Sequence, residues 1–546
     1  MTQGTSGRIT HKHLAEPQDH LIGILQWRAI HQPQQLAYRF LDTAGEGVEL
    51  GQGKAWNYAE LSRRVEAIAR QLSSFAGRPV MLAYPAGLDF VAAFFGCLQA
   101  GAIAVPVPVP GRHQGLERWW HIFMDVQPHA VLTTQQHGQI QADSADIARA
   151  IPHRVTWIVA DDPENAPNPV GDRPSFKNLD LDSPALLQYT SGSTRQPRGV
   201  IISHRNLMHN LGVIHQRFGH SPDSQGVIWL PPHHDMGLIG GILAPLYGGF
   251  PVTLMSPTAF LRQPLRWLQA ISAFGGSGGV TSGGPNFAYE RCLEKVTAEQ
   301  RRSLDLSHWD LAFTGAEPVQ AKTLIRFADA FADCGFRTSA FHPCYGLAEA
   351  TLFVSGGAKQ EAPAVAKLDR RAIARNRAVE SAAPDALPVV SCGQPAADGE
   401  LLIVDPEMRQ PCNSEQIGEI WLTGPSVAQG YWQQPEMTQE TFKGYLADGS
   451  GPFLRTGDLG FLQQGQLFVT GRLKDLIIIR GQNHYPQDIE QTVAQSHDAV
   501  RSQPGATFGL AVDGEERLVV VQEVQRTALR SLETAKVVEA IRAAVS

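Results

Sequence analysis

The chain of 546 residues is too long for one ordinary domain, and 43% hydrophobic with 18% charged residues is typical of a folded protein. The 46 basic and 53 acidic residues give a formal net charge of −7, which argues against a nucleic-acid-binding surface. Six cysteines without a CxxC pair argue against a zinc knuckle or a dense disulfide framework, and they fit a reducing cytoplasm.

The first expected elements follow a leader. Residues 1–20 lack the apolar core of a signal peptide, and we expect a flexible segment there. LSRRVEAIARQLSSF predicts an amphipathic helix, and GRPVMLAYP, DFVAAFFGCLQAG and AIAVPVPVP predict a strand, a helix and a second strand. That order predicts a parallel crossover. The apolar run 90–105 is shorter than the roughly 20 residues that a membrane-spanning helix needs, so no span is expected.

The same alternation of strands and helices continues and predicts a large α/β core over residues 21–390. Residues 356–389 are rich in Ala and Arg and resemble an insertion more than a core element. Residues 391–473 contain short, turn-bounded β segments and predict a smaller β-rich subdomain. Residues 474–546 alternate strands and helices, which predicts a small α+β domain.

The most specific segment is YTSGSTRQPRGV at residues 189–200, where one β run enters a hydroxyl-rich loop and a second β run leaves it. Hydroxyls and unobstructed backbone N–H groups suit an anionic triphosphate. The P-loop pattern G-x-x-x-x-G-K-[ST] fails after Gly192, and a plain Ser/Thr-rich turn is the alternative for such a composition. The predicted phosphate-binding residues are Thr190, Ser191, Gly192, Ser193, Thr194 and Arg198.

This string resembles the phosphate loop of the adenylate-forming superfamily, which includes acyl-CoA ligases, luciferases and peptide-synthetase adenylation domains. Arg198 stands where members usually carry Lys, so the positive charge is kept but is presented as a planar fork. The resemblance implies an α/β fold with two α/β subdomains and a small β-barrel-like subdomain. A partial α+β C-terminal domain, mobile in the family, would follow.

Four more segments occur in the family's order: LAFTGAEPV, HPCYGLAEAT, RTGDLGF and GRLKDLIIIRGQ. Each alone would more often be an ordinary turn or a solvated charge, and it is their shared order that favours the family. The resemblance implies Gly315, Ala316 and Glu317 beside adenine, Tyr345 stacked on it next to Gly346, Glu349 as the Mg²⁺ carboxylate with a hydroxyl from Thr190, Asp458 on the ribose hydroxyls, Arg472 near the ribose, and Lys474 at the hinge.

Within the superfamily, WLPPHHDMGLIGGILAPLYGG, TSGGPNFAYERC and RGQNHYP resemble fatty acyl-AMP ligases, which pass the acyl group to an acyl carrier protein instead of coenzyme A. The 356–389 insertion is similar to an extra segment thought to restrain domain movement there. By analogy His234 lies near the fatty carboxylate, and the acyl tunnel wall includes His234, Met236, Ser282, Gly283 and Phe287.

A metal site at His233, His234 and Asp235 is not expected, because neighbouring residues on a strand point to opposite faces. Ordinary core packing is the alternative to an orienting role for His234.

The expected reaction is attack of a fatty carboxylate on the α-phosphorus of ATP, with His234, Glu349 and Thr190 as catalytic residues and Mg²⁺ steadying the pyrophosphate. The expected acceptor is an acyl carrier protein or a downstream polyketide synthase module in a bacterial cytoplasm. The alternatives are a coenzyme A ligase and a catalytically weak nucleotide or lipid sensor. Nothing after Gln525 resembles the family's PxTxSGKxxR-like string, so the chain is expected to be truncated or the front of a longer synthase.

Overall fold

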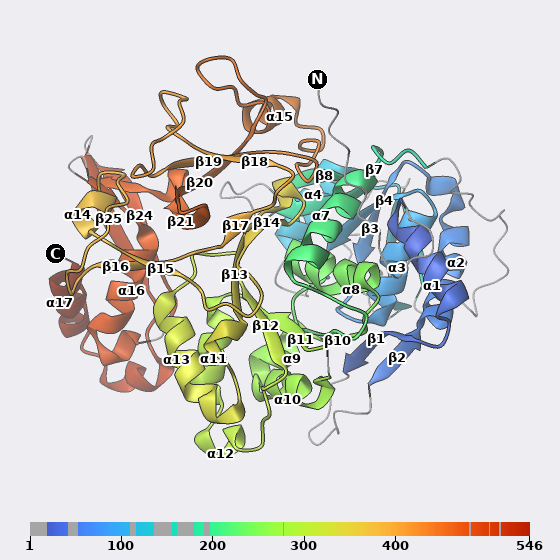
Figure 1. The fold of residues 1–546 in the computed structure, drawn as a ribbon, viewed down its shortest axis with the longest axis horizontal. Helices are drawn as coiled ribbons and strands as arrows, with labels where there is room; N and C mark the ends of the chain where they lie inside the picture. The colour runs from blue at the N-terminus through green and yellow to red at the C-terminus, as the bar shows by residue number, and fades with distance from the viewer. Residues whose placement is uncertain are drawn as a thin grey trace.

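The computed structural model describes residues 19–41, 53–109, 116–135, 155–160, 179–190, 197–276, 278–479, 482–501, 503–512 and 515–545. Figure 1 shows the first sheet and its helices in blue and green on one side and the last helices in red on the other, with the β-rich part between them at the top. In the described part of the chain, every helix is too short or too polar to cross a bilayer.

The first sheet has six strands in the order β6-β5-β3-β4-β7-β8. These are β3 (Pro79–Ala83), β4 (Ile103–Val107), β5 (Ala130–Thr133), β6 (Thr156–Val159), β7 (Pro184–Thr190) and β8 (Arg198–Ser203), with helices α2 (Tyr58–Gln71), α3 (Leu88–Gln99), α4 (Leu116–Val126) and α7 (His204–Arg217). Strands β3 and β4 pair in parallel across α3, which confirms the expected crossover and buries the apolar run. Helix α2 begins at a capping box in which Asn57 and Glu60 bond each other's backbone N–H.

The second sheet has nine strands in the order β17-β14-β13-β12-β11-β9-β10-β1-β2. They are β1 (Leu36–Leu41), β2 (Lys54–Asn57), β9 (Gln225–Ile228), β10 (Val252–Met255), β11 (Val280–Gly283), β12 (Trp309–Thr314), β13 (Phe341–Gly346), β14 (Phe353–Gly356) and β17 (Gln394–Pro395). Their helices are α1 (Leu21–His31), the π-helix η2 (Met236–Leu243), α8 (Ala244–Gly248), α9 (Pro257–Arg262), α10 (Leu265–Phe274), α11 (Asn286–Lys295), α12 (Ala298–Arg301) and α13 (Ala321–Phe331). Because β9, β11, β12 and β13 run parallel, their carboxyl ends and the loops that follow lie on one edge of the sheet.

The core of the second sheet is largely aromatic. Trp309 is fully buried and contacts Trp267, Tyr289, Phe327 and Phe336 with ring centroids 5.2 to 6.2 Å apart. Rings in such offset and edge-to-face contacts fill the space between sheet and helices closely. This packing fixes the strands whose ends carry the site.

The remaining chain forms smaller units. A four-stranded antiparallel sheet consists of β18 (Glu400–Val404), β19 (Gly418–Thr423), β20 (Leu454–Gln463) and β21 (Gln466–Arg472), with α15 (Pro435–Phe442) beside it. The 356–389 segment holds most of a separate two-stranded sheet of β15 (Val365–Leu368) and β16 (Leu387–Val390), with α14 (Arg370–Ile373). The last part contains β22 (Ile477–Ile479), β23 (Gln482–His484), β24 (Gly505–Val512), β25 (Glu515–Gln522), α16 (Pro486–Ser496) and α17 (Thr534–Val545).

These findings confirm the expected mixed α/β class. Strand β17, which the sequence pattern assigned to the β-rich part, pairs with β14 at the edge of the nine-stranded sheet. Its two residues are too few for a periodic pattern to be visible, so only the pairing reveals where it belongs.

Candidate active site

The hydroxyl-rich segment lies in a β-hairpin. Strands β7 and β8 pair antiparallel with Thr190 opposite Arg198, which confirms the expected β run on each side of the loop. Ser191, Gly192, Ser193 and Thr194 lie outside the described residues. The Arg198 guanidinium lies 5.5 Å from the centre of the Tyr431 ring, so a positive charge stands at the loop end of this hairpin.

Tyr345, Asp458 and Arg472 come from three separate segments and form one chain of hydrogen bonds. The Tyr345 hydroxyl donates to Asp458 Oδ2 at 2.7 Å, and Arg472 Nε donates to Asp458 Oδ1 at 3.1 Å. Burial raises the pKa of Asp458, and the neighbouring Arg472 charge opposes this rise. Three of the residues expected around adenine and ribose are therefore brought together.

Glu349 lies in the short 3₁₀ turn η5 (Ala348–Ala350) that follows β13. Its Oε1 accepts a hydrogen bond of 2.8 Å from the Tyr431 hydroxyl, and its backbone C=O accepts one of 2.9 Å from Ala428 N. In the part of the chain that the structure describes, Oε2 has no hydrogen-bond partner. Tyr431 lies 82 residues after Glu349 in the sequence, and no local sequence pattern predicts this contact.

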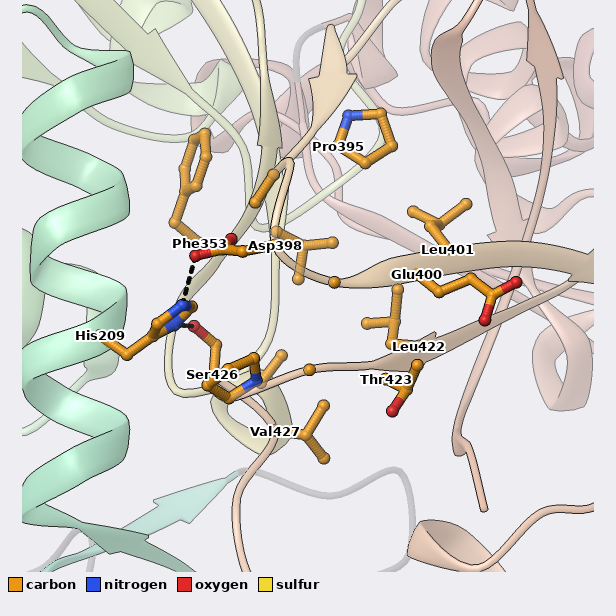
Figure 2. Close-up of a pocket in the computed structure, with 16 residues that line it drawn as sticks. His209, Phe353, Pro395, Asp398, Glu400, Leu401, Leu422, Thr423, Ser426 and Val427 are labelled. Carbon is orange, nitrogen blue, oxygen red and sulfur yellow. Dashed lines mark hydrogen bonds and ion pairs between the residues drawn. The ribbon is translucent and has the colours of Figure 1, made fainter. Parts of the chain in front are cut away.

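The segment 425–431 that carries Tyr431 is anchored on helix α7. His209 of α7 bonds Ser426 Oγ through Nδ1 at 2.7 Å and Asp398 Oδ2 through Nε2 at 2.6 Å, beside a pocket of about 400 Å³ (Figure 2). Asn210 Nδ2 also donates to Ser426 Oγ at 3.0 Å. Because the hydroxyl is engaged from two sides, this cluster joins α7 to the β-rich part.

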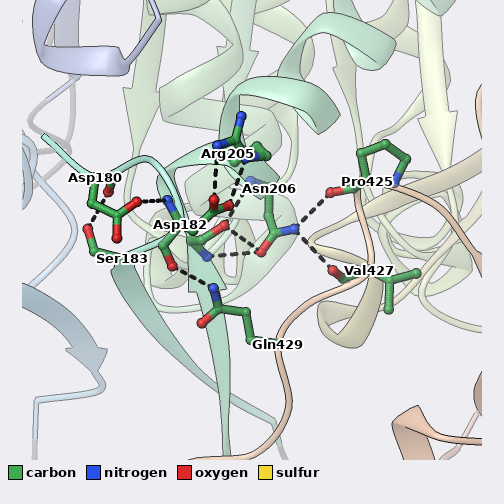
Figure 3. Close-up of polar contacts among 9 residues, drawn as sticks. Asp180, Asp182, Ser183, Arg205, Asn206, Pro425, Val427 and Gln429 are labelled. Atoms are coloured by element: carbon green, nitrogen blue, oxygen red, sulfur yellow. Dashed lines mark hydrogen bonds and ion pairs between the residues drawn. The ribbon is translucent and has the colours of Figure 1, made fainter.

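A second set of bonds holds the same segment at the start of α7 (Figure 3). Asn206 Nδ2 donates to the backbone oxygens of Pro425 at 2.8 Å and Val427 at 3.0 Å. Gln429 Nε2 donates to the backbone oxygen of Asp182 at 2.5 Å. These bonds fix the position of the segment that reaches Glu349.

His233 and His234 lie in a turn between β9 and η2, not on a strand, so the premise of the sequence argument about opposite faces was wrong. Their ring centroids are 4.6 Å apart. Gln188 Nε2 of β7 donates to the backbone oxygen of His233 at 2.8 Å, which ties this turn to the hairpin. Burial lowers the pKa of His234, with a further contribution from the Arg118 charge, so the imidazole is neutral near pH 7.

Asp235 follows as the residue that caps η2, where its Oδ1 accepts from Met236 N at 2.7 Å. The pKa of Asp235 is raised to about 6, mainly by burial; the bond from Met236 opposes this rise and the charge of Glu349 adds to it. Glu349 also raises the pKa of Asp458, so three carboxyl groups share one electrostatic environment. In the sequence, Asp235 stood out only as a candidate metal ligand.

Lys474, the residue expected at the hinge, lies near the charge of Asp458. Burial lowers the pKa of Lys474, and the nearby charges of Arg472 and Arg198 lower it further. Like charges are thus gathered beside Asp458, where a polyanion would relieve their repulsion. The described residues hold no cluster of three or more His, Cys, Asp or Glu side chains that could bind a metal ion by themselves.

A pocket of about 640 Å³ lies beside Asp235 and Tyr345, which both line it. One part of its lining is formed by Gly315, Ala316, Tyr345 and Gly346, and a larger apolar part by Ile214, Phe218, Met236, Phe313, Leu352 and Phe353. Ala316 has a φ of 68°, in the left-handed region, which turns the chain sharply after β12. The pocket combines the residues expected at adenine with an apolar compartment.

Five residues predicted at the acyl chain or the adenine are not among those that line this pocket: His234, Ser282, Gly283, Phe287 and Glu317. Ser282 and Gly283 are buried in β11, and the Ser282 hydroxyl accepts from Trp267 Nε1 at 2.8 Å. Phe287 is 47% exposed and packs against Trp229. Glu317 lines a different cavity, next to Tyr485.

The model of the family described as "AMP-binding enzyme" matches residues 25–432. The chain belongs to the AMP-binding enzyme family. A medium-chain-fatty-acid–[acyl-carrier-protein] ligase of Moorena producens is 44% identical over 538 residues, which cover 96% of this chain and 89% of the relative. A putative fatty-acid–CoA ligase of Mycobacterium bovis is 39% identical over 92% of this chain and 87% of its own.

Among solved structures, a fatty acid AMP ligase from Legionella pneumophila is 37% identical to this AMP-binding enzyme, with a TM-score of 0.78 over 98% of this chain and 91% of that chain. The region matched by the family model contains the elements that carry most of the predicted site residues, namely β7, β8, β12, β13 and η5. Asp458, Arg472 and Lys474 lie beyond that matched region, and in this AMP-binding enzyme the folding of β20 and β21 brings the first two to Tyr345.

Proposed function

We propose that this AMP-binding enzyme activates a fatty acid with ATP as fatty acyl-AMP, releases pyrophosphate, and passes the acyl group to an acyl carrier protein. The proposal rests on one observation: Tyr345 lines the 640 Å³ pocket and also donates a hydrogen bond to Asp458. An apolar compartment beside a polar nucleotide-sized group suits a molecule that is lipid at one end and nucleotide at the other.

The residues proposed to bind the nucleotide are assigned from their chemistry and their position in the pocket. Tyr345, Gly346, Gly315 and Ala316 offer flat and backbone surface to adenine. Asp458 has acceptor oxygens for the ribose hydroxyls, with Arg472 fixing its orientation. Glu317 lines a different cavity, so its contact with the base stays a prediction.

The phosphates would lie at the hairpin, with hydroxyls from Thr190, Ser191, Ser193 and Thr194, the backbone of Gly192 and the Arg198 guanidinium. The Glu349 carboxylate fits Mg²⁺, because a small hard cation binds one carboxylate together with substrate phosphates, and Oε2 has no partner among the described residues. When bound, the cation would neutralise charge on the leaving pyrophosphate. Lys474 is proposed at the hinge next to this group.

The reaction requires positioning more than acid–base catalysis. A fatty carboxylate is ionised at neutral pH and can attack the α-phosphorus directly, so the O–P bond to pyrophosphate breaks as the acyl O–P bond forms. Neutral His234 can orient the carboxylate without pairing with it as an ion. The acyl chain would extend past Met236 into the apolar part of the pocket.

The acceptor of the acyl group depends on how the last part of the chain, residues 474–546, can move. We propose that the 356–389 insertion restrains this movement. Asn483 N donates to the backbone oxygen of Ala374 at 3.0 Å, and Asn483 Nδ2 donates to Asn376 Oδ1 at 2.8 Å. These bonds join the insertion to the last part of the chain. The printed name of the Moorena relative supports a carrier protein as acceptor, and that of the Mycobacterium relative supports coenzyme A.

The test is incubation of the chain with ATP, Mg²⁺ and a medium-chain fatty acid, followed by detection of acyl-AMP by mass spectrometry and of pyrophosphate by a coupled assay. Parallel reactions contain coenzyme A or a phosphopantetheinylated carrier protein. Acyl-AMP that is consumed by the carrier protein supports the proposal, and acyl-CoA would refute the acceptor. Glu349→Gln should abolish product, whereas Glu436→Gln, an exposed glutamate of α15, should not.

A further inference from the structure

Strand β19 is buried along nearly its whole length, yet its second residue is a glutamate. All of residues 418–422 are buried, and Glu419 is only 2% exposed. Glutamate is rarely buried unless it is paired, because taking a carboxylate out of water is costly. A buried carboxylate at this place in the strand therefore needs a reason.

Both oxygens of the Glu419 carboxylate accept hydrogen bonds. Oε2 accepts from Trp421 Nε1 at 2.9 Å and from the Arg455 guanidinium at 3.1 Å through Nε and 2.9 Å through Nη2. Oε1 accepts from the backbone N–H of Gly457 at 3.1 Å. The ion pair with Arg455 compensates for the burial of the charge. The bond from Gly457 ties the carboxylate to the residue that precedes Asp458.

Gly457 lies in a bulge of the neighbouring strand. Where β19 pairs with β20, the single residue 420 of β19 faces residues 456–458 of β20. Gly457, at the centre of this bulge, has a φ of 71°, in the left-handed region that glycine adopts without strain. A bulge bends its strand and turns a side chain to a new direction. The side chain that this bulge presents is that of Asp458.

The two ends of Asp458 are held by different groups. Its carboxylate accepts from Tyr345 on one oxygen and from Arg472 on the other. Its backbone follows Gly457, which Glu419 holds. The shape of the bulge thus sets where the Asp458 side chain starts, and the bonds to its carboxylate set the direction in which it ends.

We propose, on the basis of the proposed function and the ribose role assigned there to Asp458, that Glu419 is a positioning residue for ATP. It holds the bulge in the shape that brings the Asp458 carboxylate to the ribose hydroxyls, and it does not touch the nucleotide. A displacement of about 1 Å in such a site can cost about 100-fold in rate, so the hold on the bulge has a kinetic effect. Glu419 acts on ATP only through Asp458, which separates this role from a role in folding.

The variant Glu419→Gln keeps the shape of the side chain and changes its donors. An amide has one acceptor oxygen, and the Arg455 charge together with the Trp421 N–H retains it. The amide NH2 group then faces the N–H of Gly457, and that bond is lost. We expect kcat/KM for ATP in pyrophosphate release to fall about tenfold, with the KM for fatty acid unchanged.

A nucleotide without ribose hydroxyls distinguishes positioning from folding. Wild type and Glu419→Gln should bind 2′,3′-dideoxy-ATP equally, within about twofold. Glu419→Gln should also cost at most about twofold when it is added to Asp458→Asn, because Glu419 acts through Asp458. Glu400→Gln, an exposed glutamate of β18 in the same sheet, is the matched control. Phe461→Leu, which removes buried ring area from β20, should lower thermal stability and keep wild-type ATP kinetics.

Calorimetric binding of ATP without fatty acid makes the test independent of turnover. Weaker ATP binding in Glu419→Gln, with equal binding of the dideoxy nucleotide, supports the positioning role even where the wild type forms no acyl-AMP and the proposed function fails. An equal loss with both nucleotides, an additive loss in the double variant, or unchanged ATP binding overturns the role. When the wild type still forms acyl-AMP, each of these results leaves the proposed function standing. A wild-type chain that binds no ATP overturns both.

A second variant reaches the same bulge without changing Glu419. In Gly457→Ala the added Cβ meets no atom of the described residues within 4 Å beyond its chain neighbours, so there is space for it. The left-handed φ strains any residue other than glycine, and the bulge should shift. We expect the same pattern as in Glu419→Gln, with weaker binding of ATP and unchanged binding of the dideoxy nucleotide. Wild-type binding of ATP by a folded Gly457→Ala chain would count against the role of the bulge.

Discussion

Replacement of Tyr431 by phenylalanine removes one oxygen atom, the donor that holds Glu349. The ring is 5% exposed and would keep its edge-to-face contact with Phe442, so the fold should persist. Burial raises the pKa of the Tyr431 hydroxyl far above its ordinary value, with the Glu349 charge adding to the effect, so the wild-type group donates at every pH of interest. A hydrogen bond to a charged group contributes about 1.5–3 kcal/mol, which corresponds to a roughly 10- to 150-fold loss in kcat/KM for ATP.

The assay is steady-state pyrophosphate release with ATP varied at saturating fatty acid, and then with fatty acid varied at saturating ATP. The loss should fall on the ATP side, because Glu349 is proposed to act on the phosphates and not on the acyl chain. Tyr445→Phe is the matched control, since Tyr445 is 44% exposed in the same β-rich part. Wild-type ATP kinetics in Tyr431→Phe, at unchanged thermal stability, would refute the role assigned to this contact.

Asp458→Asn keeps an acceptor for Tyr345 but removes the charge opposite Arg472, and we expect about a 10- to 100-fold lower kcat/KM for ATP with an unchanged KM for fatty acid; unaltered ATP dependence would contradict the ribose role. Asp235 has a pKa of about 6 in the folded chain against an ordinary value of 3.8, so the native carboxyl keeps a proton that the unfolded chain has lost, and its contribution to stability falls as pH rises from about 4 to above 6. Asp235→Asn removes this fall, so the free energy of unfolding in urea should rise relative to wild type between pH 4.5 and pH 7, and parallel pH profiles would count against it. Asn376→Ala removes the bond from the Asn483 side chain, and we expect hydrogen exchange in residues 482–496 to quicken about two- to fivefold, whereas Asn413→Ala should leave it unchanged.

Much of the site's secondary structure could be predicted from short sequence segments, because its strands and turns form between residues that are close together in the sequence. The hairpin around residues 190–198 needs only two β runs and a loop, and both runs pair as expected. The run before Glu349 likewise forms β13, whose end carries Tyr345 and Gly346 to the pocket. Resemblance supplied the roles of these residues, and local pattern supplied their secondary structure.

Contacts between distant segments could not be read in this way. Tyr431 reaches Glu349 across 82 residues, and no periodicity or turn signal records such a pairing. Ser282 and Phe287 were expected in the tunnel wall, yet the Ser282 hydroxyl bonds inside the sheet and Phe287 packs outside it. Which face a strand residue presents to a cavity depends on register and on neighbouring helices, and a single sequence specifies neither directly.

Sequence alone thus determined the α/β class, the hairpin and the order of the motifs, because strand and helix periods and turn residues act over a few positions. Tertiary structure alone decided that Tyr345, Asp458 and Arg472 form one chain of hydrogen bonds, and that His220 and His342 pack against Phe218. The physical reason is that burial and hydrogen bonding between remote segments depend on how whole sheets pack, and that packing is set by the summed contacts of the core and not by any one string of residues.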